Sequence, residues 1–214
     1  MNEKEYPVQF EISGPYAMFT RPDTGSAFVS YPAPTWSACK GMFEAVARLK
    51  SAYIHPVKVE ICAPVNFHRY MTNYGGPLRK GNQLKGGDSY QLGAYVLVDV
   101  CYRVYGTVRE FATPPNPRVN HCHYLQDLFT RRLEKGRFYD TPCLGWREFV
   151  PNYMGIFREK TTIEESINEY IPSMLVSPFD ANVSGKTQDV SGKNAARYAH
   201  GGAWIQKGVL TYAQ

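Results

Sequence analysis

The residue types best suited to chemistry lie together at residues 120–124, which have the sequence Asn-His-Cys-His-Tyr. Histidine can accept or donate a proton near neutral pH, because its ordinary pKa is about 6.5. Histidines one residue apart, followed by a tyrosine, therefore offer a general base and a general acid in one short segment. His123, Tyr124 and His121 are the candidate catalytic residues. In the structural alternative, the histidines only form hydrogen bonds near the start of a helix.

The same segment raises the question of a metal site, because histidine and cysteine are common zinc ligands. Consecutive residues do not easily converge on one metal ion, and the sequence holds no second ligand pair at zinc-finger spacing. It also contains no glycine-rich nucleotide fingerprint and no Gly-x-Ser-x-Gly elbow. We therefore expect neither a metal nor an organic cofactor.

Positive charge gathers in separate segments of this chain, which has 214 residues and a net charge of +5. Such a mild excess is compatible with RNA, whose affinity for proteins comes largely from phosphate contacts. Lys40, beside Gly41 at a helix start, is also placed to hold a phosphate. The other candidate RNA-binding residues are Arg69, Arg79, Lys80, Lys85, Arg131, Arg132 and Lys135. The alternative for each of these positions is an ordinary solvated face.

Helices are expected next to these candidate residues. After the extended, proline-marked residues 30–34, Thr35 can cap a helix whose apolar residues recur at helical spacing: Cys39, Met42, Phe43, Val46 and Leu49. A second helix is marked by Leu125, Leu128, Phe129 and Leu133, and Gly136 is its expected end. Residues 162–165 resemble a capping box that would begin a short acidic helix before Pro172.

Alternating apolar residues predict strands at 8–12, 57–61 and 93–111, with Gly14-Pro15 ending the first. Residues 71–93 and 180–203 are rich in small and polar residues and are expected to form long exposed loops. The order strand, helix, strand, strand, helix is most of a ferredoxin-like, RRM-type unit, so the expected fold class is α+β.

Several motifs, in the right order, resemble the CRISPR-associated Cas family five, type I-C (Dvulg) subtype. The resemblance covers nearly the whole chain. The matching segments are Gly14-Pro-Tyr-Ala-Met-Phe-Thr-Arg-Pro22, Ser30 to Ala47, Asn73-Tyr-Gly-Gly76, Asp99-Val-Cys-Tyr-Arg-Val104, Phe129 to Gly136, Pro142-Cys-Leu-Gly-Trp-Arg-Glu-Phe149 and Gly208-Val-Leu210.

The resemblance implies a ferredoxin-like (RRM-type, RAMP) domain at residues 1–138, followed by a smaller antiparallel β unit at 139–214. Its implied partners are CRISPR RNA, the repeat of the precursor RNA, and the backbone and large subunits of a Cascade complex. Its implied activity is metal-independent cleavage of the precursor within the repeat. The odd, widely spaced cysteines suggest reduced thiols, and no apolar run is long enough to span a membrane, so a cytoplasmic protein is expected.

The chain departs from the family pattern at the catalytic positions. The family places a Lys-His pair just before the second helix. Counted back from Phe129 without gaps, that pair falls on Tyr124 and Leu125 in this chain. One inserted residue moves it to His123 and Tyr124. The family's helix-one tyrosine or histidine falls on Ala47, with Tyr53 nearby.

The resemblance then implies His123 as base or acid, Tyr124 or His121 as its partner, and Arg131 as the cation beside the phosphate. One alternative is a catalytically inactive assembly subunit, with the RNA matured by another nuclease. A further alternative is an RRM-like domain that binds a small molecule or a protein.

Overall fold

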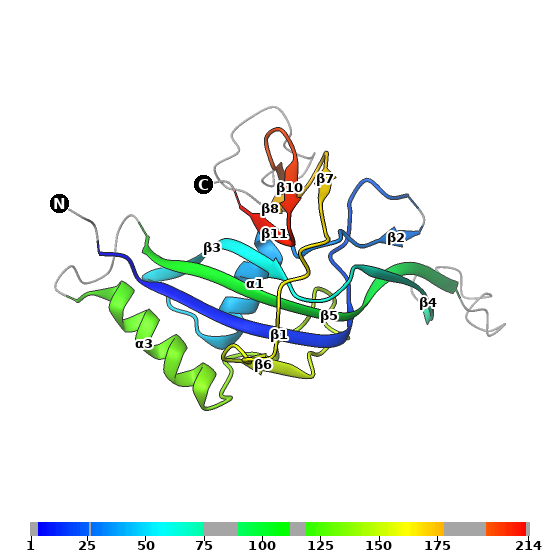
Figure 1. Cartoon of the computed structure of the whole chain (residues 1–214). Coiled ribbons are helices and arrows are strands. Elements are labelled where there is room, and N and C mark those ends of the chain that lie inside the picture. Colours follow the sequence, from blue (N-terminus) through cyan, green and yellow to red (C-terminus); the bar gives the residue numbers. More distant parts are fainter. Residues whose placement is uncertain (1–3, 26, 75–89, 112–118, 178–195, 213–214) are drawn as a thin grey trace, which may run out of the picture.

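The computed structural model describes residues 4–25, 27–74, 90–111, 119–177 and 196–212. Its centre is one long strand, β5 (Tyr90–Glu110), which runs through the molecule in Figure 1. The C-terminal half of β5 pairs antiparallel with β1 (Pro7–Ala17) on one side and with β3 (Ala52–Ile61) on the other. The strand expected at 93–111 is thus confirmed, whereas the strands expected at 8–12 and 57–61 are both longer than predicted.

Strand β1 continues through Gly14-Pro15, where the sequence predicts a break. Gly14 and Tyr16 pair with Val100 and Val98 of β5, so the register is the same on both sides of Pro15. The residue of β5 opposite Pro15 is Asp99, which has a φ of +52°. Proline lacks an N–H group, so a strand tolerates it where the ladder needs no donor.

Helices α1 (Trp36–Val46) and α3 (His121–Glu134) cover one face of this sheet. Their shared contact is aromatic, because the ring of Phe10 on β1 lies 4.9 Å from that of Phe43 on α1 and 6.4 Å from that of Phe129 on α3. The helix periodicity is confirmed in both, except that Leu49 lies beyond the end of α1. Gly136, with a φ of +58°, follows α3 as expected.

The N-terminal half of β5 pairs with two further strands. Strand β4 (Asn66–Tyr74) is antiparallel to it and β2 (Phe28–Val29) is parallel. The expected long loop at 71–93 is therefore wrong for residues 71–74 and 90–93, which are strand; residues 75–89 lie outside the described part. The polar residues Thr72 and Asn73 near the end of β4 interrupt its apolar residues, so alternation did not reveal this part of the strand.

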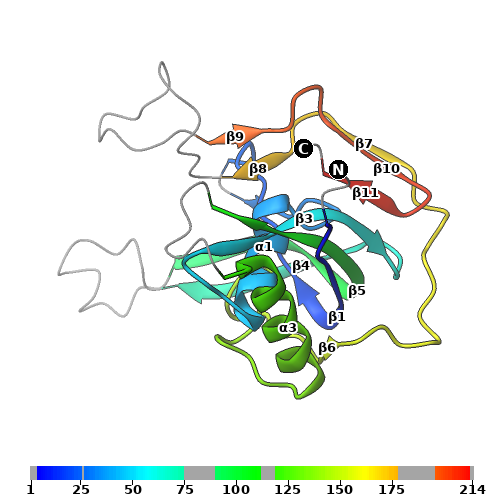
Figure 2. The same cartoon turned by 90° about the vertical axis from the view of Figure 1, so that its left-hand side faces the viewer.

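The C-terminal strands extend the same sheet on both edges. Strand β6 (Tyr153–Gly155) pairs with β1, and β11 (Val209–Thr211) pairs with β3 and leads on to β10 (Ala203–Gln206) and β7 (Glu169–Ile171). Strands β8 (Leu175–Ser177) and β9 (Arg197–Tyr198) form a separate pair beside them (Figure 2). The loop expected at 180–203 is therefore wrong where β9 and β10 lie, and residues 178–195 are outside the described part.

The short helix expected after residue 162 is wrong. The N–H group of Glu164 donates to the carbonyl of Ile61 at 2.9 Å, and its carboxylate accepts from the Ser166 hydroxyl at 2.5 Å. The N–H group of Ile167 donates to the carbonyl of Glu164 at 3.3 Å, so residues 162–168 form a connection with a single turn that leads into β7, and the capping-box residues do not begin a helix.

Candidate functional site

The predicted catalytic segment forms the start of α3, at the corner where β1, β3 and β5 come together (Figure 1). Asn120 caps the helix, since its side-chain oxygen accepts from the N–H group of His123 at 2.8 Å. Its amide nitrogen donates to the Tyr6 hydroxyl at 2.6 Å, which fixes the cap to the residue before β1. The helix start is thus held rigidly by local capping and by one contact across the chain.

His121 joins the helix start to the ends of two strands. Its N–H group donates to the Glu110 carboxylate at 3.2 Å, at the end of β5. Its ring nitrogen Nδ1 lies 3.0 Å from the Ser51 hydroxyl, just before β3. The Ser51 carbonyl in turn accepts from the N–H group of Phe111 at 3.1 Å. A hydrogen bond at one ring nitrogen fixes the orientation of an imidazole, which is what proton transfer at a defined atom requires.

His123 and Tyr124 both point away from the core. His123 is exposed, and Tyr124 keeps 51% of its surface accessible to solvent. The corner therefore presents imidazole and phenol groups beside the N-terminal end of a helix, where backbone N–H groups favour anions. Such a corner can hold a phosphate, and its imidazole and phenol groups can accept or donate protons beside it.

The basic residues of α3 lie further along the helix. Arg131 is paired with Asp127 at 3.5 Å, and Arg132 donates to the carbonyl of Val46 at 3.1 Å, which joins α3 to the end of α1. Lys135 is the exposed C-terminal cap. Eight residues separate Arg131 from His123, about 12 Å along a helix axis. The fold therefore does not bring Arg131 to a phosphate held by His123.

Lys40, the lysine predicted to hold a phosphate on α1, forms an ion pair with Glu44 one turn later. Beside it, a groove of about 570 Å³ separates α1 from residues 139–147. Gly41 lines this groove together with two arginines, Arg48 and Arg147, and two acidic residues, Glu44 and Asp140. The groove next to the predicted position therefore carries as many carboxylates as guanidinium groups, and the lysine itself is paired with Glu44.

Arg69 is the last of the predicted RNA-binding residues that the structure describes. It is exposed on β4 and lies opposite Tyr95 of β5. It lies along the N-terminal half of β5, whereas α3 packs against the other half (Figure 1). Arg79, Lys80 and Lys85 lie outside the described residues. The described cations of the two basic segments are therefore not brought together.

The positions at which the sequence departs from the family pattern are apolar core positions. Ala47 ends α1 with 2% of its surface exposed, and Leu125 is 1% exposed on the inner face of α3. Tyr53 is half-buried on β3, where its ring lies 4.9 Å from that of Phe111. Neither Ala47 nor Leu125 offers a functional group.

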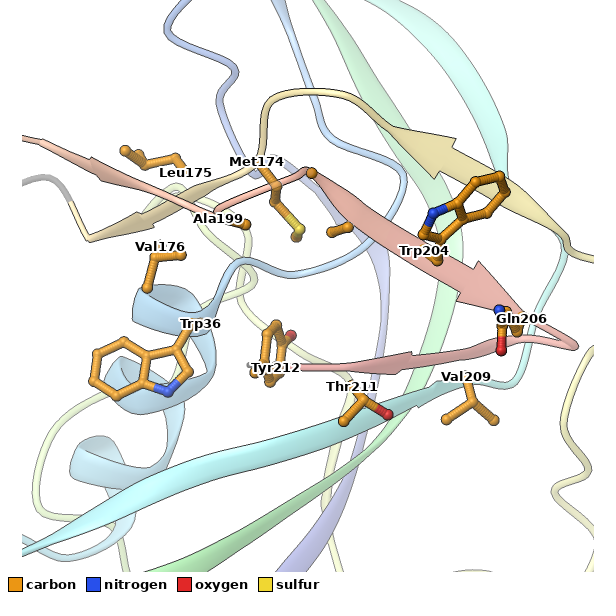
Figure 3. Close-up of a pocket in the computed structure, with 12 residues that line it drawn as sticks. Trp36, Met174, Leu175, Val176, Ala199, Trp204, Gln206, Val209, Thr211 and Tyr212 are labelled. Carbon is orange, nitrogen blue, oxygen red and sulfur yellow. The ribbon is translucent and has the colours of Figure 1, made fainter. Parts of the chain in front are cut away.

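A pocket of about 340 Å³ opens between the start of α1, β8 and the β10–β11 pair (Figure 3). Its lining is mainly apolar, with Trp36, Met174 and Trp204 around it, and none of the described residues that line it is charged. The hydroxyl of Tyr212 donates to the carbonyl of Pro34 at 2.8 Å, and burial raises the pKa of Tyr212 well above its ordinary value. The described lining therefore offers no charged side chain to bind a phosphate.

Within the described residues, no three His, Cys, Asp or Glu side chains gather as they would to hold a metal ion. The described part of the chain also contains no helix with the length and apolar character needed to cross a membrane.

The family model described as CRISPR-associated protein (Cas_Cas5), in its Cas5d form, matches residues 8–197. The chain belongs to the Cas5d family. A protein of Thermus thermophilus named CRISPR pre-crRNA endoribonuclease Cas5d is 32% identical over 145 residues, which are 66% of this chain and 61% of that protein. The match therefore spans about three fifths of this curated relative.

Solved structures share the Cas5d-family fold. A crystal structure titled as a CRISPR-associated protein superposes with a TM-score of 0.69 at 17% identity, covering 99% of this chain and 95% of the other. A chain of a CRISPR RNA-guided surveillance complex gives a TM-score of 0.50 at 16% identity, covering 91% and 88%. At these identities the likeness concerns the fold alone.

Three residues at the candidate site of this Cas5d-family chain were not found from the sequence: Tyr6, Ser51 and Glu110. Ser51 and His121 are separated by 70 positions, and Tyr6 and Asn120 by 114. Nothing in the neighbouring sequence marks a serine before a strand, or a glutamate at the end of one, as a functional residue. Only the pairing of β1, β3 and β5 brings them to one corner.

Proposed function

We propose that this Cas5d-family protein binds CRISPR RNA in the cytoplasm as a subunit of a type I-C Cascade complex. It would hold the repeat-derived 5′ handle and contact the backbone and large subunits. The family match carries this proposal, since it covers residues 8–197. The exposed cations Arg69 and Lys135 support it, because phosphate contacts provide much of the affinity for RNA.

We also propose that the fold is ferredoxin-like. The order β6-β1-β5-β3, with antiparallel neighbours and helices α1 and α3 on one face, supports this assignment. A division into residues 1–138 and 139–214 stays a prediction, in which β6 from the second part completes the sheet of the first.

As an enzyme, the protein would cleave precursor CRISPR RNA within the repeat without a metal ion. The observation that carries this proposal is the exposure of His123 and Tyr124 at the fixed start of α3, beside His121. One histidine would remove the proton from a ribose 2′-hydroxyl, which attacks the adjacent phosphorus. The other histidine, or Tyr124, would protonate the departing 5′-oxygen, leaving a cyclic phosphate.

The test is a cleavage assay with the repeat RNA of the CRISPR array encoded beside the protein, in EDTA, analysed on a denaturing gel. We expect one discrete cut, and a loss of at least about 100-fold in rate for His123→Ala, because general acid–base catalysis contributes on this order. His68→Ala is the matched control, since His68 is also exposed but lies on β4. Equal cleavage by wild type and His123→Ala would refute the assignment of His123.

The second candidate function is that of a catalytically inactive assembly subunit. The burial of Ala47 and Leu125 at the family's catalytic positions favours it, as does the distance of Arg131 from the corner. Tight, salt-sensitive binding of the repeat RNA with no cut would support this function and assign maturation to another nuclease.

A further inference from the structure

A pair of aromatic rings lies at the end of the β3–β5 ladder. Tyr53 on β3 and Phe111 at the end of β5 have ring centroids 4.9 Å apart and planes inclined by 31°. Phe111 keeps 45% of its surface exposed, although it adjoins a strand with a buried inner face. The neighbouring Ile54 and Val108 point the other way, into the core, with 2% and 4% exposure. The alternation of β strands therefore holds this ring pair toward solvent.

Positive charge accompanies the ring pair. Arg109 is the direct partner of Tyr53 across the β3–β5 ladder, so its side chain leaves the sheet on the same face. The ring of His55 lies 6.4 Å from that of Tyr53. Burial lowers the pKa of His55 to about 4, and the charges of Arg109 and Arg197 contribute to this shift. The guanidinium group of Arg109 therefore belongs to the same face of the ladder as the ring pair.

This region is continuous with the catalytic corner. The N–H group of Phe111 donates to the carbonyl of Ser51 at 3.1 Å, and the hydroxyl of the same serine lies 3.0 Å from Nδ1 of His121. One residue thus connects the ring pair with the imidazole. A nucleotide stacked on the rings would have its phosphate near the start of α3.

We infer that Tyr53, Phe111 and Arg109 form a stacking platform for an unpaired base of the RNA, next to the phosphate held at the catalytic corner. Every base has an aromatic face, so a half-exposed ring pair beside a guanidinium group suits single-stranded RNA whatever its sequence. The inference rests on the proposed RNA-binding function, but it names residues and a surface that cleavage itself does not require.

A second exposed ring pair provides a matched control. Tyr170 on β7 and Trp204 on β10 lie 4.5 Å apart with planes inclined by 32°, and Trp204 is 58% exposed. This pair belongs to the β7–β10 edge of the sheet, away from the start of α3 (Figure 1). The two ring pairs have similar distances and angles, so they differ mainly in where they lie on the sheet.

The test measures binding and stacking separately on the full chain. The probe is the repeat RNA made non-cleavable by a 2′-deoxy nucleotide at each candidate cut site, with 2-aminopurine placed at one position after another. We expect wild type to quench the fluorescence strongly at one position, and Tyr53→Leu or Phe111→Leu to relieve that quenching. Each variant should also weaken binding about 5- to 100-fold. Tyr53→Phe should behave like wild type, and so should Trp204→Leu.

The other possible outcomes distinguish a failure of the stacking platform from a failure of the proposed RNA binding. If wild type binds the probe tightly and the Tyr53 and Phe111 variants bind and quench equally well, the platform is refuted while RNA binding stands. If these variants bind RNA normally but no longer assemble with other Cascade subunits, the rings form a protein contact and the inference is wrong. If wild type does not bind the probe, the platform and the proposed function are refuted together. Thermal unfolding of each variant checks that it is folded.

Discussion

The carboxylate of Glu11 is fully buried on the sheet face opposite the helices, with 0% of its surface exposed. Arg158 donates to it at 2.5 Å, Arg103 at 3.3 Å and the Thr161 hydroxyl at 2.8 Å. Burial by itself raises the pKa of Glu11, but the hydrogen bonds from Arg158, Thr161 and Arg103 outweigh burial, so the pKa is lowered. This one side chain thereby fixes residues 158–161 across the sheet.

We predict that Glu11→Gln lowers the free energy of unfolding by about 3 kcal/mol at pH 7, because it leaves the guanidinium groups without their buried counter-charge. The folded-state pKa is lowered, so the ionised carboxylate stabilises the protein above its ordinary pKa of about 4.3, and this contribution disappears as the pH falls. The difference between wild type and variant should therefore be constant above about pH 5 and shrink as the pH falls below about 4.3. Urea unfolding at several pH values measures it. The control is Glu5→Gln at an exposed position, and an equal loss there would contradict the explanation.

At the scale of elements, the turn at residues 144–149 shows why one glycine is required. The N–H group of Met18 donates to the carbonyl of Leu144 at 2.9 Å, which joins this turn to the end of β1. Gly145 has a φ of +93°, and a Cβ atom there would overlap the carbonyl oxygen of Met18. By contrast, Gly41 on α1 has open space within 4 Å of its Cβ position.

These two glycines give opposite predictions for the same substitution. Gly145→Ala should lower the free energy of unfolding by at least about 2 kcal/mol, since it combines a strained φ with a clash against backbone. Gly41→Ala should raise it by about 0.5–1 kcal/mol, because alanine loses less entropy than glycine in a helix. Denaturant unfolding of both variants is the measurement. A tolerated Gly145→Ala would mean that the turn is not fixed against β1.

For the whole molecule, the candidate RNA-binding cations among the described residues are spread over α1, β4, and α3 with its C-terminal cap, and do not form one cluster. An RNA that contacts them all must follow an extended path around the sheet. We predict that RNA affinity falls steeply between 50 and 200 mM salt, and that Arg69→Gln and Lys135→Gln each reduce the slope of log K against log salt by about 0.7. Fluorescence anisotropy in a salt series measures these slopes.

The control for the salt series is Lys207→Gln, which changes an exposed lysine at the β10–β11 turn and should leave the slope unchanged. An affinity that stays flat with salt would contradict the RNA-binding proposal and favour a domain that binds a small molecule or a protein.

The sequence by itself determined the elements whose signals are local. The predicted cap of α1 is made within three residues, by the Thr35 hydroxyl, which accepts from the N–H group of Ala38. The apolar faces of both helices and the core alternation of β5 repeat with the period of their own backbone. The family motifs are likewise strings of neighbouring residues, so the order of amino acids alone is enough to recognise them.

The tertiary structure alone decided the features that depend on distant segments. It made β4 a strand by pairing it with β5, and it replaced the expected helix after residue 162 by bonding Glu164 to Ile61. It also brought Ser51 to His121 and Tyr53 to Phe111, through the register of β3 with β5. The physical reason is that capping and periodicity act over a few residues, whereas a β register is set by the packing of the whole sheet.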